Sequence, residues 1–272
     1  MRLLIVPLST RSRLIIAQRT AVTLQPNLPQ TVDEKIAKRA HKMWSAWEGS
    51  STWWKKKVTA WGNKVMNTVP YEEWSLKGFP HAPPGLFNDP PARWWEIWKP
   101  QLPSNPDSES AALISSSVVP VVYPSGLIKD EQVSILLNDL ALRGVPKHKK
   151  LMIWSLVASP LTLPVALFPV IPNIPGFYLL YRAWSHWKAW EGAKLLARII
   201  KENKIILEPS HTLASIYDSS LPSEDSLEKL ILQDSAVNKI VEVLGAEEIS
   251  GELHRALGQV RKKLETSQKE KE

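Results

Sequence analysis

The chain has 272 residues and a formal charge of +7 at pH 7, with 44% hydrophobic and 22% charged residues, so wholesale disorder is excluded. Cysteine is absent, which excludes disulfides, thiolate catalysis and cysteine-bound zinc. Thirteen tryptophans in a basic chain favour an anionic lipid membrane as a partner. No nucleic acid partner is expected, because no stacking or groove-reading module is recognisable.

Residues 1–30 allow two interpretations. The first 32 residues hold four arginines and no acidic residue, a composition similar to that of a mitochondrial transit segment. The same stretch contains the apolar runs LLIVPL and RLIIAQ, joined by a short polar turn, which is typical of a β hairpin.

Residues 31–69 are predicted to form a basic, tryptophan-rich amphipathic helix, either continuous or broken at residues 49–51. Apolar residues recur at helical spacing, and lysines occupy the opposite face. Either the tryptophans pack on a protein core, or the helix lies at a membrane surface. The membrane interpretation places these tryptophans at the interface: Trp44, Trp47, Trp54 and Trp61.

Residues 70–123 are expected to be a proline-rich connector. Within it, the stretch LISSSVVPVVYP is rich in residues that favour strands, and it is expected to pair with the N-terminal hairpin.

Residues 124–203 are predicted to be a helical region, beginning with a helix over residues 125–143. Residues 151–181 then run for 31 positions without a charged residue or histidine, whereas a bilayer crossing needs about 20. Repeated prolines break this apolar segment, predicting a kinked helix to Phe168, a turn, and a second helix from Phe177. The alternative is a buried helical hairpin.

The residues that follow the apolar segment resemble the aromatic and basic belt of a membrane interface. They are Arg182, Trp184, Trp187 and Trp190. Residues 222–266 are predicted to form C-terminal helices, the first ended or bent by Gly245. The expected fold class is therefore a mainly α, membrane-associated helical protein with a small N-terminal β element.

Several stretches resemble the fungal mitochondrial potassium–proton exchange-related family. They are MRLLIVPLSTR, AHKMWSAWEGSSTWWKKKVTAWGNKVMN and FPVIPNIPGFYLLYRAWSHWKAWEGAKLL, of which PNIPGFYLLYRAWSHW is the most specific. LPVALFPVIPNIPGF is also similar to the membrane segment of the leucine-zipper, EF-hand transmembrane family, although this sequence has no EF-hand.

The resemblance implies a protein of the mitochondrial inner membrane that is a component or accessory of potassium–proton exchange and so affects matrix volume. One proline-broken segment cannot enclose a gated path, so we expect a homo-oligomer or a complex with another carrier. The alternative function is a membrane-peripheral scaffold or lipid-binding protein without transport activity.

Few residues are candidates for contact with potassium and protons. Backbone carbonyls freed by prolines could line an ion path, which points to Pro169, Pro172, Asn173 and Pro175, although these prolines could equally only shape a corner. His186 could sense pH, or it could be an interfacial histidine.

An enzyme is not expected. The sequence contains no nucleophile elbow, zinc-protease motif, Walker loop or dinucleotide fingerprint, so no catalytic residue and no cofactor are predicted. No metal site is predicted either, because the six histidines show no metal-ligand spacing along the chain.

Overall fold

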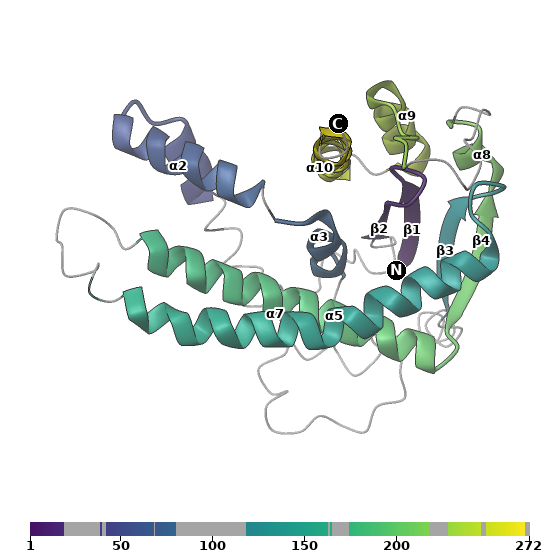
Figure 1. Ribbon diagram of the computed structural model, residues 1–272, viewed down its shortest axis with the longest axis horizontal. Coiled ribbons are helices and arrows are strands. Elements are labelled where there is room, and N and C mark those ends of the chain that lie inside the picture. The colour runs from purple at the N-terminus through teal and green to yellow at the C-terminus, as the bar shows by residue number, and fades with distance from the viewer. Residues whose placement is uncertain are drawn as a thin grey trace, which may run out of the picture. The chain divides into compact units, whose positions relative to one another are not determined.

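The computed structural model describes residues 1–18, 39, 42–67, 69–79, 118–162, 164, 174–217, 228–245 and 249–269. The side chains of Trp54, Val65, Met66 and Ile174 are not among the described ones. The chain forms two compact units. The larger unit holds the sheet and most of the helices, and the smaller unit holds residues 42–67 with helix α2 (Figure 1).

The larger unit contains a four-stranded mixed sheet in the order β2-β1-β3-β4. Strands β1 (Arg2–Pro7) and β2 (Arg13–Gln18) form an antiparallel hairpin, which confirms the hairpin interpretation of the N-terminal residues. Strand β3 (Val119–Pro124) pairs with β1 of the hairpin, as expected, and the pairing is parallel, which was not predicted. Strand β4 (Ile205–Ser210) pairs in parallel with β3 and was not predicted.

Both faces of β1 are buried, which explains its continuous apolar run. Leu4, Val6 and Leu8 point to one side, where they join a core with residues of the C-terminal helices, including Val237 and Leu257. The helices that supply this core are α8 (His211–Ala214), α9 (Asp234–Leu244) and α10 (Ser250–Lys269).

The C-terminal helices follow the predicted pattern. Gly245 ends α9 in the left-handed conformation, with φ of 59°, which confirms the predicted stop. The buried residues of α10 include Leu253, Leu257 and Val260, as its helical spacing indicated.

Two long helices lie side by side in Figure 1 and pack against each other along their length. Helix α5 (Asp130–Ala158) has 29 residues, about 43 Å at 1.5 Å per residue, and continues into the 3-10 turn η3 (Ser159–Thr162). Helix α7 (Ile174–Lys201) has 28 residues. The predicted helix over residues 125–143 was too short, because α5 continues through exposed Pro146 and the lysines that follow it.

The description of residues 70–123 as a connector was wrong at both ends. Helix α3 (Tyr71–Lys77) is an ordered element with buried Glu73, Ser75 and Leu76, and β3 is a strand of the sheet. Helix α3 was missed because only seven residues lie between Pro70 and the turn at Gly78, too few to show a clear helical pattern within a proline-rich stretch.

In the smaller unit the predicted break occurs. Residues 42–48 are helical, a turn follows at Gly49, and α2 (Trp53–Met66) is the second helix. Trp44 Nε1 donates to Asn63 Oδ1 over 3.1 Å, and Asn63 Nδ2 donates to Glu48 Oε1 over 2.8 Å, so polar side chains join the two helices.

Candidate functional site: a buried glutamate and histidine cluster

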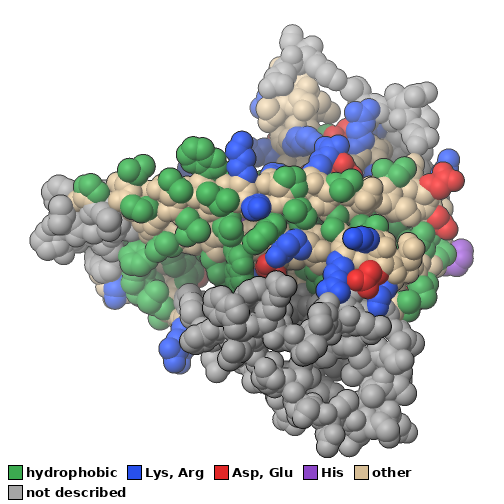
Figure 2. Space-filling model, turned by 90° about the horizontal axis from the view of Figure 1, so that it is seen from below, with side chains coloured by type: hydrophobic (Ala, Val, Ile, Leu, Met, Phe, Trp, Pro, Cys, Tyr) green, Lys and Arg blue, Asp and Glu red, His purple; other side chains and the backbone are tan. Residues whose placement is uncertain are grey.

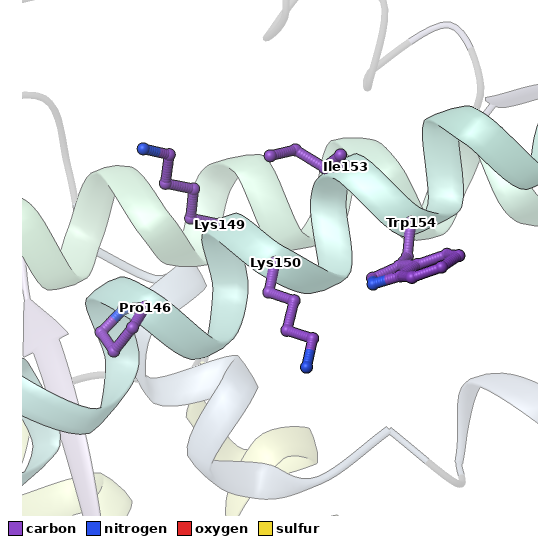
Figure 3. A pocket seen from close by; sticks show the side chains of 5 residues that line it. All are labelled: Pro146, Lys149, Lys150, Ile153 and Trp154. Carbon is purple, nitrogen blue, oxygen red and sulfur yellow. The ribbon is translucent and has the colours of Figure 1, made fainter.

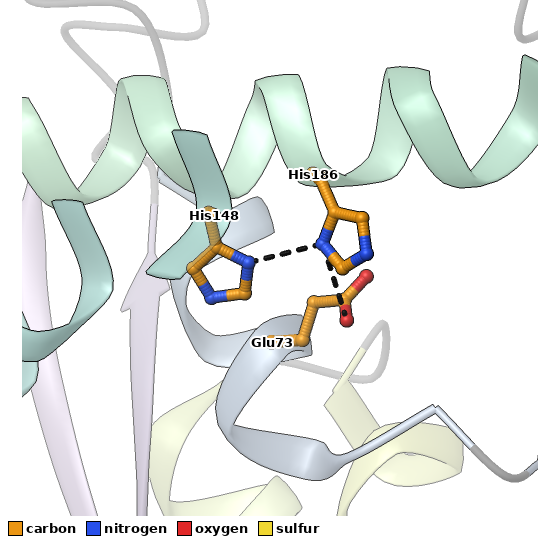
Figure 4. Close-up of side chains that lie close together, drawn as sticks. All are labelled: Glu73, His148 and His186. Atoms are coloured by element: carbon orange, nitrogen blue, oxygen red, sulfur yellow. Dashed lines mark hydrogen bonds and ion pairs between the residues drawn. The ribbon is translucent and has the colours of Figure 1, made fainter. Parts of the chain in front are cut away.

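Three helices bring two histidines and a carboxylate together inside the larger unit. Glu73 comes from α3, His148 from α5 and His186 from α7, and each is about 3% exposed. Their side chains point toward one another in Figure 4. We call these three residues, with Arg182 and Ser185 of α7, the Glu–His cluster. Burying so many polar groups requires that they satisfy one another.

Two glycines allow α3 to lie close to the helix pair. A Cβ atom at Gly192 of α7 would collide with the carbonyl oxygen of Leu76, and one at Gly144 of α5 would lie 2.8 Å from Leu76 Cδ1. Gly192 is therefore needed for the close approach of the Leu76 backbone, three residues after Glu73, and Gly144 leaves room for the Leu76 side chain. This contact fixes the depth at which α3 presents its carboxylate.

Glu73 is held as a carboxylate by three short hydrogen bonds. Arg182 donates from Nη1 to Oε1 over 2.8 Å and from Nη2 to Oε2 over 3.0 Å, and Ser185 Oγ donates to Oε1 over 2.7 Å. Burial by itself raises the pKa of Glu73, but the hydrogen bonds and the charge of Arg182 outweigh it and leave this pKa below its usual value. Glu73 is therefore ionised at neutral pH.

The hydrogen bonds also fix where each histidine carries its proton. Arg182 Nη2 lies 2.9 Å from His186 Nε2, and a guanidinium group can only donate, so Nε2 of His186 accepts. Neutral His186 then carries its proton on Nδ1, which lies 3.1 Å from Nδ1 of His148. His186 donates across this contact, and the proton of His148 is on Nε2.

Both imidazoles are neutral at pH 7. Burial lowers the pKa of His148 to about 4, with Glu73 acting in the opposite direction. Burial also lowers the pKa of His186, and the nearby charge of Arg182 adds to the effect while Glu73 opposes it. The cluster thus holds two neutral imidazole rings and one carboxylate, all three buried from solvent.

A lysine surrounded by aromatic rings borders the cluster. Lys77 Nζ lies between 4.4 and 4.9 Å from the ring centres of Trp74, Tyr181 and Trp184, and donates to the Tyr181 hydroxyl over 3.1 Å. Ring faces attract a cation. Burial nevertheless lowers the pKa of Lys77 to about 8, with the charge of Glu73 acting the other way.

The structure changes the roles of the residues predicted to follow the apolar segment. Arg182 has its partner inside the protein: its side chain is 15% exposed and pairs with Glu73. Trp184 packs against Lys77, and Trp187 and Trp190 are half-buried. His186 is a member of the cluster rather than a surface histidine.

The other predicted site residues lie outside the cluster. Pro175 is exposed in the first turn of α7, whereas Pro169, Pro172 and Asn173 are outside the described residues, so the ion path stays a prediction. In the smaller unit Trp61 is 48% exposed, and Trp44 and Trp47 are half-buried. The Trp54 side chain is outside the description.

Sequence reasoning missed Glu73 and treated His148 as part of a basic run. A signal for His148 was present. The buried positions of α5 are spaced by four, four, three and four residues, ending at His148: Val133, Leu137, Ala141, Gly144 and His148. The three lysines around this histidine, at positions 147, 149 and 150, are exposed. Helical phase therefore separates the histidine from its basic neighbours.

A second feature is the apolar surface where α5 ends and α7 begins. We define the distal arm as residues 151–162 and 174–181. Figure 2 shows hydrophobic side chains along a helix pair. The exposed large hydrophobic residues of the distal arm are Leu151, Ile153, Trp154, Leu156, Val157, Leu161, Phe177 and Leu180. Such a concentration is typical of an interaction surface.

The base of the distal arm combines lysines with apolar side chains. An open hollow on α5 is lined by Pro146, Lys149, Lys150, Ile153 and Trp154, and in Figure 3 each lysine lies one helical turn before an apolar residue. Within the described part of the chain, no helix has both the length and the apolar character of a membrane span.

The sequence has relatives in fungi. The family described as mitochondrial K+-H+ exchange-related matches residues 2–200. An uncharacterized protein of Schizosaccharomyces pombe is 30% identical over 184 residues, covering 67% of this chain and 69% of the relative. An uncharacterized protein of Saccharomyces cerevisiae is 27% identical over 242 residues, covering 85% and 75%. No solved structure matches.

Proposed function

Because the chain belongs to the mitochondrial K+-H+ exchange-related family, we propose that it is a component or accessory of potassium–proton exchange across the mitochondrial inner membrane. The family match carries the exchange proposal, and the distal arm supports its membrane part, because exposed apolar side chains favour contact with a bilayer. The effect in the cell would be on matrix cation content and volume.

The distal arm has the chemistry of a surface that binds anionic lipid. Exposed residues such as Trp154 and Leu161 would enter the acyl boundary, and their burial would be favourable. Lys147, Lys149 and Lys150 are exposed at the base of the arm, where each could contribute about 1 kcal/mol near an anionic membrane. Long lysine side chains reach the headgroups while their stems stay on apolar surface.

An accessory or oligomeric subunit fits better than a self-contained exchanger. Transporter folds are commonly built from repeated bundles of spans around a central site. Among the described residues, the buried carboxylate of Glu73 and the two buried histidines lie together in the Glu–His cluster, and the distal arm presents apolar side chains. Conduction would then come from several copies together or from another carrier.

The test is the swelling of isolated, de-energised mitochondria in potassium acetate. Acetic acid carries protons inward, so swelling requires potassium to enter in exchange for them. We expect swelling to be lost on deletion and restored by the wild-type chain, but not by the double variant Trp154→Glu/Leu161→Glu. Leu142→Glu, at a position 64% exposed on α5 outside the arm, is the matched control and should restore swelling.

Unchanged swelling after deletion would contradict the exchange proposal. The protein would then be a membrane-peripheral scaffold or lipid-binding protein, whose deletion alters membrane association of partners without altering potassium entry. The distal arm supports membrane contact in both cases, so the swelling measurement is what separates them.

A further inference from the structure

We propose that Glu73, His148 and His186 form a binding site for a divalent transition metal ion of the zinc type. The inference is independent of the transport proposal, because it rests only on the geometry and chemistry of the Glu–His cluster. It concerns a site buried among α3, α5 and α7, away from the exposed surface of the distal arm.

The donor atoms already have spacings close to those of a metal site. His148 Nδ1 lies 3.1 Å from His186 Nδ1, and His186 Nδ1 lies 3.7 Å from Glu73 Oε2. One ligand atom from each of the three residues lies within 4.8 Å of the others. Zinc bonds of about 2.0–2.1 Å in a tetrahedron place ligand atoms roughly 3.3 Å apart. Shifts of an ångström or less would therefore complete the three-ligand arrangement.

The donor types select the class of metal. Two imidazole nitrogens with one carboxylate oxygen suit zinc, cobalt and nickel, whereas potassium, calcium and magnesium require sets of oxygen ligands. A metal binds the unprotonated nitrogen of a neutral imidazole. In the free protein Nδ1 of His148 is such a nitrogen, since it accepts from His186.

Metal binding requires one change in the proton arrangement. His186 must transfer its proton from Nδ1 to Nε2, and the metal takes the vacated lone pair. Arg182 then gives up its bond to Nε2, and Nη2 must move away because two N–H groups would otherwise face each other, while Nη1 keeps its bond to Glu73. No proton is gained or lost overall.

The positive charge of Arg182 disfavours the binding of a metal cation, because it lies beside two of the proposed ligands. Lys77 and Lys147 add to the positive potential at His186. Removing the charge at position 182 should therefore tighten metal binding, whereas removing a ligand should weaken it. A purely structural network predicts neither change.

The consequence of binding would be to join three helices. Glu73 and His186 are already linked through Arg182, but His148 contacts the others through its bond to His186. A metal ion would tie α5 directly to α3 and α7. The site would then act as a metal-dependent clamp on the docking of α3.

The experiment is titration of the purified full chain with Co2+ and then Zn2+. We expect visible absorption bands of cobalt with nitrogen and oxygen ligands, one equivalent of cobalt per chain, and displacement by Zn2+. Absence of the bands in folded wild-type protein at millimolar Co2+ would overturn the proposal.

Single-residue variants locate the site. His148→Ala and His186→Ala should each weaken binding more than the roughly 10–100-fold typical of losing an outer partner of a metal ligand. His254→Ala, at an exposed histidine of α10, is the matched control and should bind like wild type. Arg182→Gln should bind more tightly. Equal affinity in wild type, His148→Ala and His186→Ala would overturn the assignment.

A measurement on wild-type protein covers the case in which a variant fails to fold. X-ray absorption at the zinc edge should show two imidazole ligands per bound ion, and histidine nitrogen NMR should show two Nδ1 resonances that shift on Zn2+ addition. Coordination through Nε2 atoms, or by fewer than two imidazoles, would contradict this site.

Discussion

Nη2 of Arg182 lies 2.9 Å from Nε2 of His186, and this one contact determines the protonation pattern of a buried histidine pair. Because the guanidinium group is always a donor, His186 has to present a lone pair there and a proton on its other nitrogen. The same nitrogen of Arg182 also donates to Glu73. A single side chain therefore satisfies the carboxylate and orients the histidines.

Arg182→Lys should destabilise the protein by roughly 1.5–3 kcal/mol, because lysine keeps the charge but cannot make the paired bonds to Glu73 while bonding His186. Urea denaturation followed by tryptophan fluorescence measures the change. Arg143→Lys is the control: Arg143 pairs with Asp139 on the surface of α5, its side chain is 80% exposed, and the expected change is below about 0.5 kcal/mol. Equal losses in both variants would refute the role given to Arg182.

Gly192→Ala should destabilise by about 1–3 kcal/mol, because the added methyl group meets the backbone carbonyl of Leu76 and α3 must move. Thermal unfolding checks this. Gly258→Ala is the matched substitution at an exposed position inside α10, where a Cβ meets nothing within 4 Å. That variant should gain about 0.5–1 kcal/mol. A neutral Gly192→Ala would show that α3 does not need the close approach.

The lowered pKa of Lys77 predicts that the free energy of unfolding depends on pH in the alkaline range. Its folded pKa is lowered from 10.5 to about 8, so between these values the unfolded chain binds more protons than the folded one. Stability then rises with pH across this window, and the cost of burying the charge is fully present below pH 8. The free energy of unfolding of Lys77→Met, relative to wild type, should therefore decrease from pH 8 to pH 10. Parallel pH profiles of the two proteins would exclude this effect.

Trp154→Glu/Leu161→Glu should reduce binding to vesicles that contain anionic phospholipid by at least about tenfold, since two apolar contacts become charged near an anionic surface. Co-sedimentation with vesicles measures the bound fraction, and Leu142→Glu serves as the control. Raising the salt concentration should weaken the binding of all three proteins, because it screens the lysines. If the double variant binds like wild type, the distal arm is not the lipid contact.

Local patterns in the sequence were sufficient for much of the fold. The apolar runs of β1 and β2, the stop at Gly245 and the helical spacing in α10 depend on neighbours within a few residues, so they can be read directly. Helix α3 and strand β4 could not be read in this way. Helix α3 is short and depends on its packing against Gly192, which is distant in the sequence. Strand β4 depends on its pairing with β3.

The Glu–His cluster was beyond sequence reasoning for a similar reason. Its members are contributed by three helices, and His186 follows His148 by 38 positions, so no motif spacing connects them. Aromatic and basic residues after an apolar run suggested an interface for Arg182, whereas a buried acid from a distant segment is its partner. Only the helical phase of His148 carried a local signal.

The separation of Glu73 from Arg182 has a consequence for how the chain acquires its structure. The two residues are 109 positions apart, so α3 is synthesised long before the side chain that neutralises its glutamate. At about 5–20 residues per second, Arg182 is synthesised roughly 5–20 s after Glu73. Docking of α3 is therefore a non-local event that cannot be completed until α7 has been made.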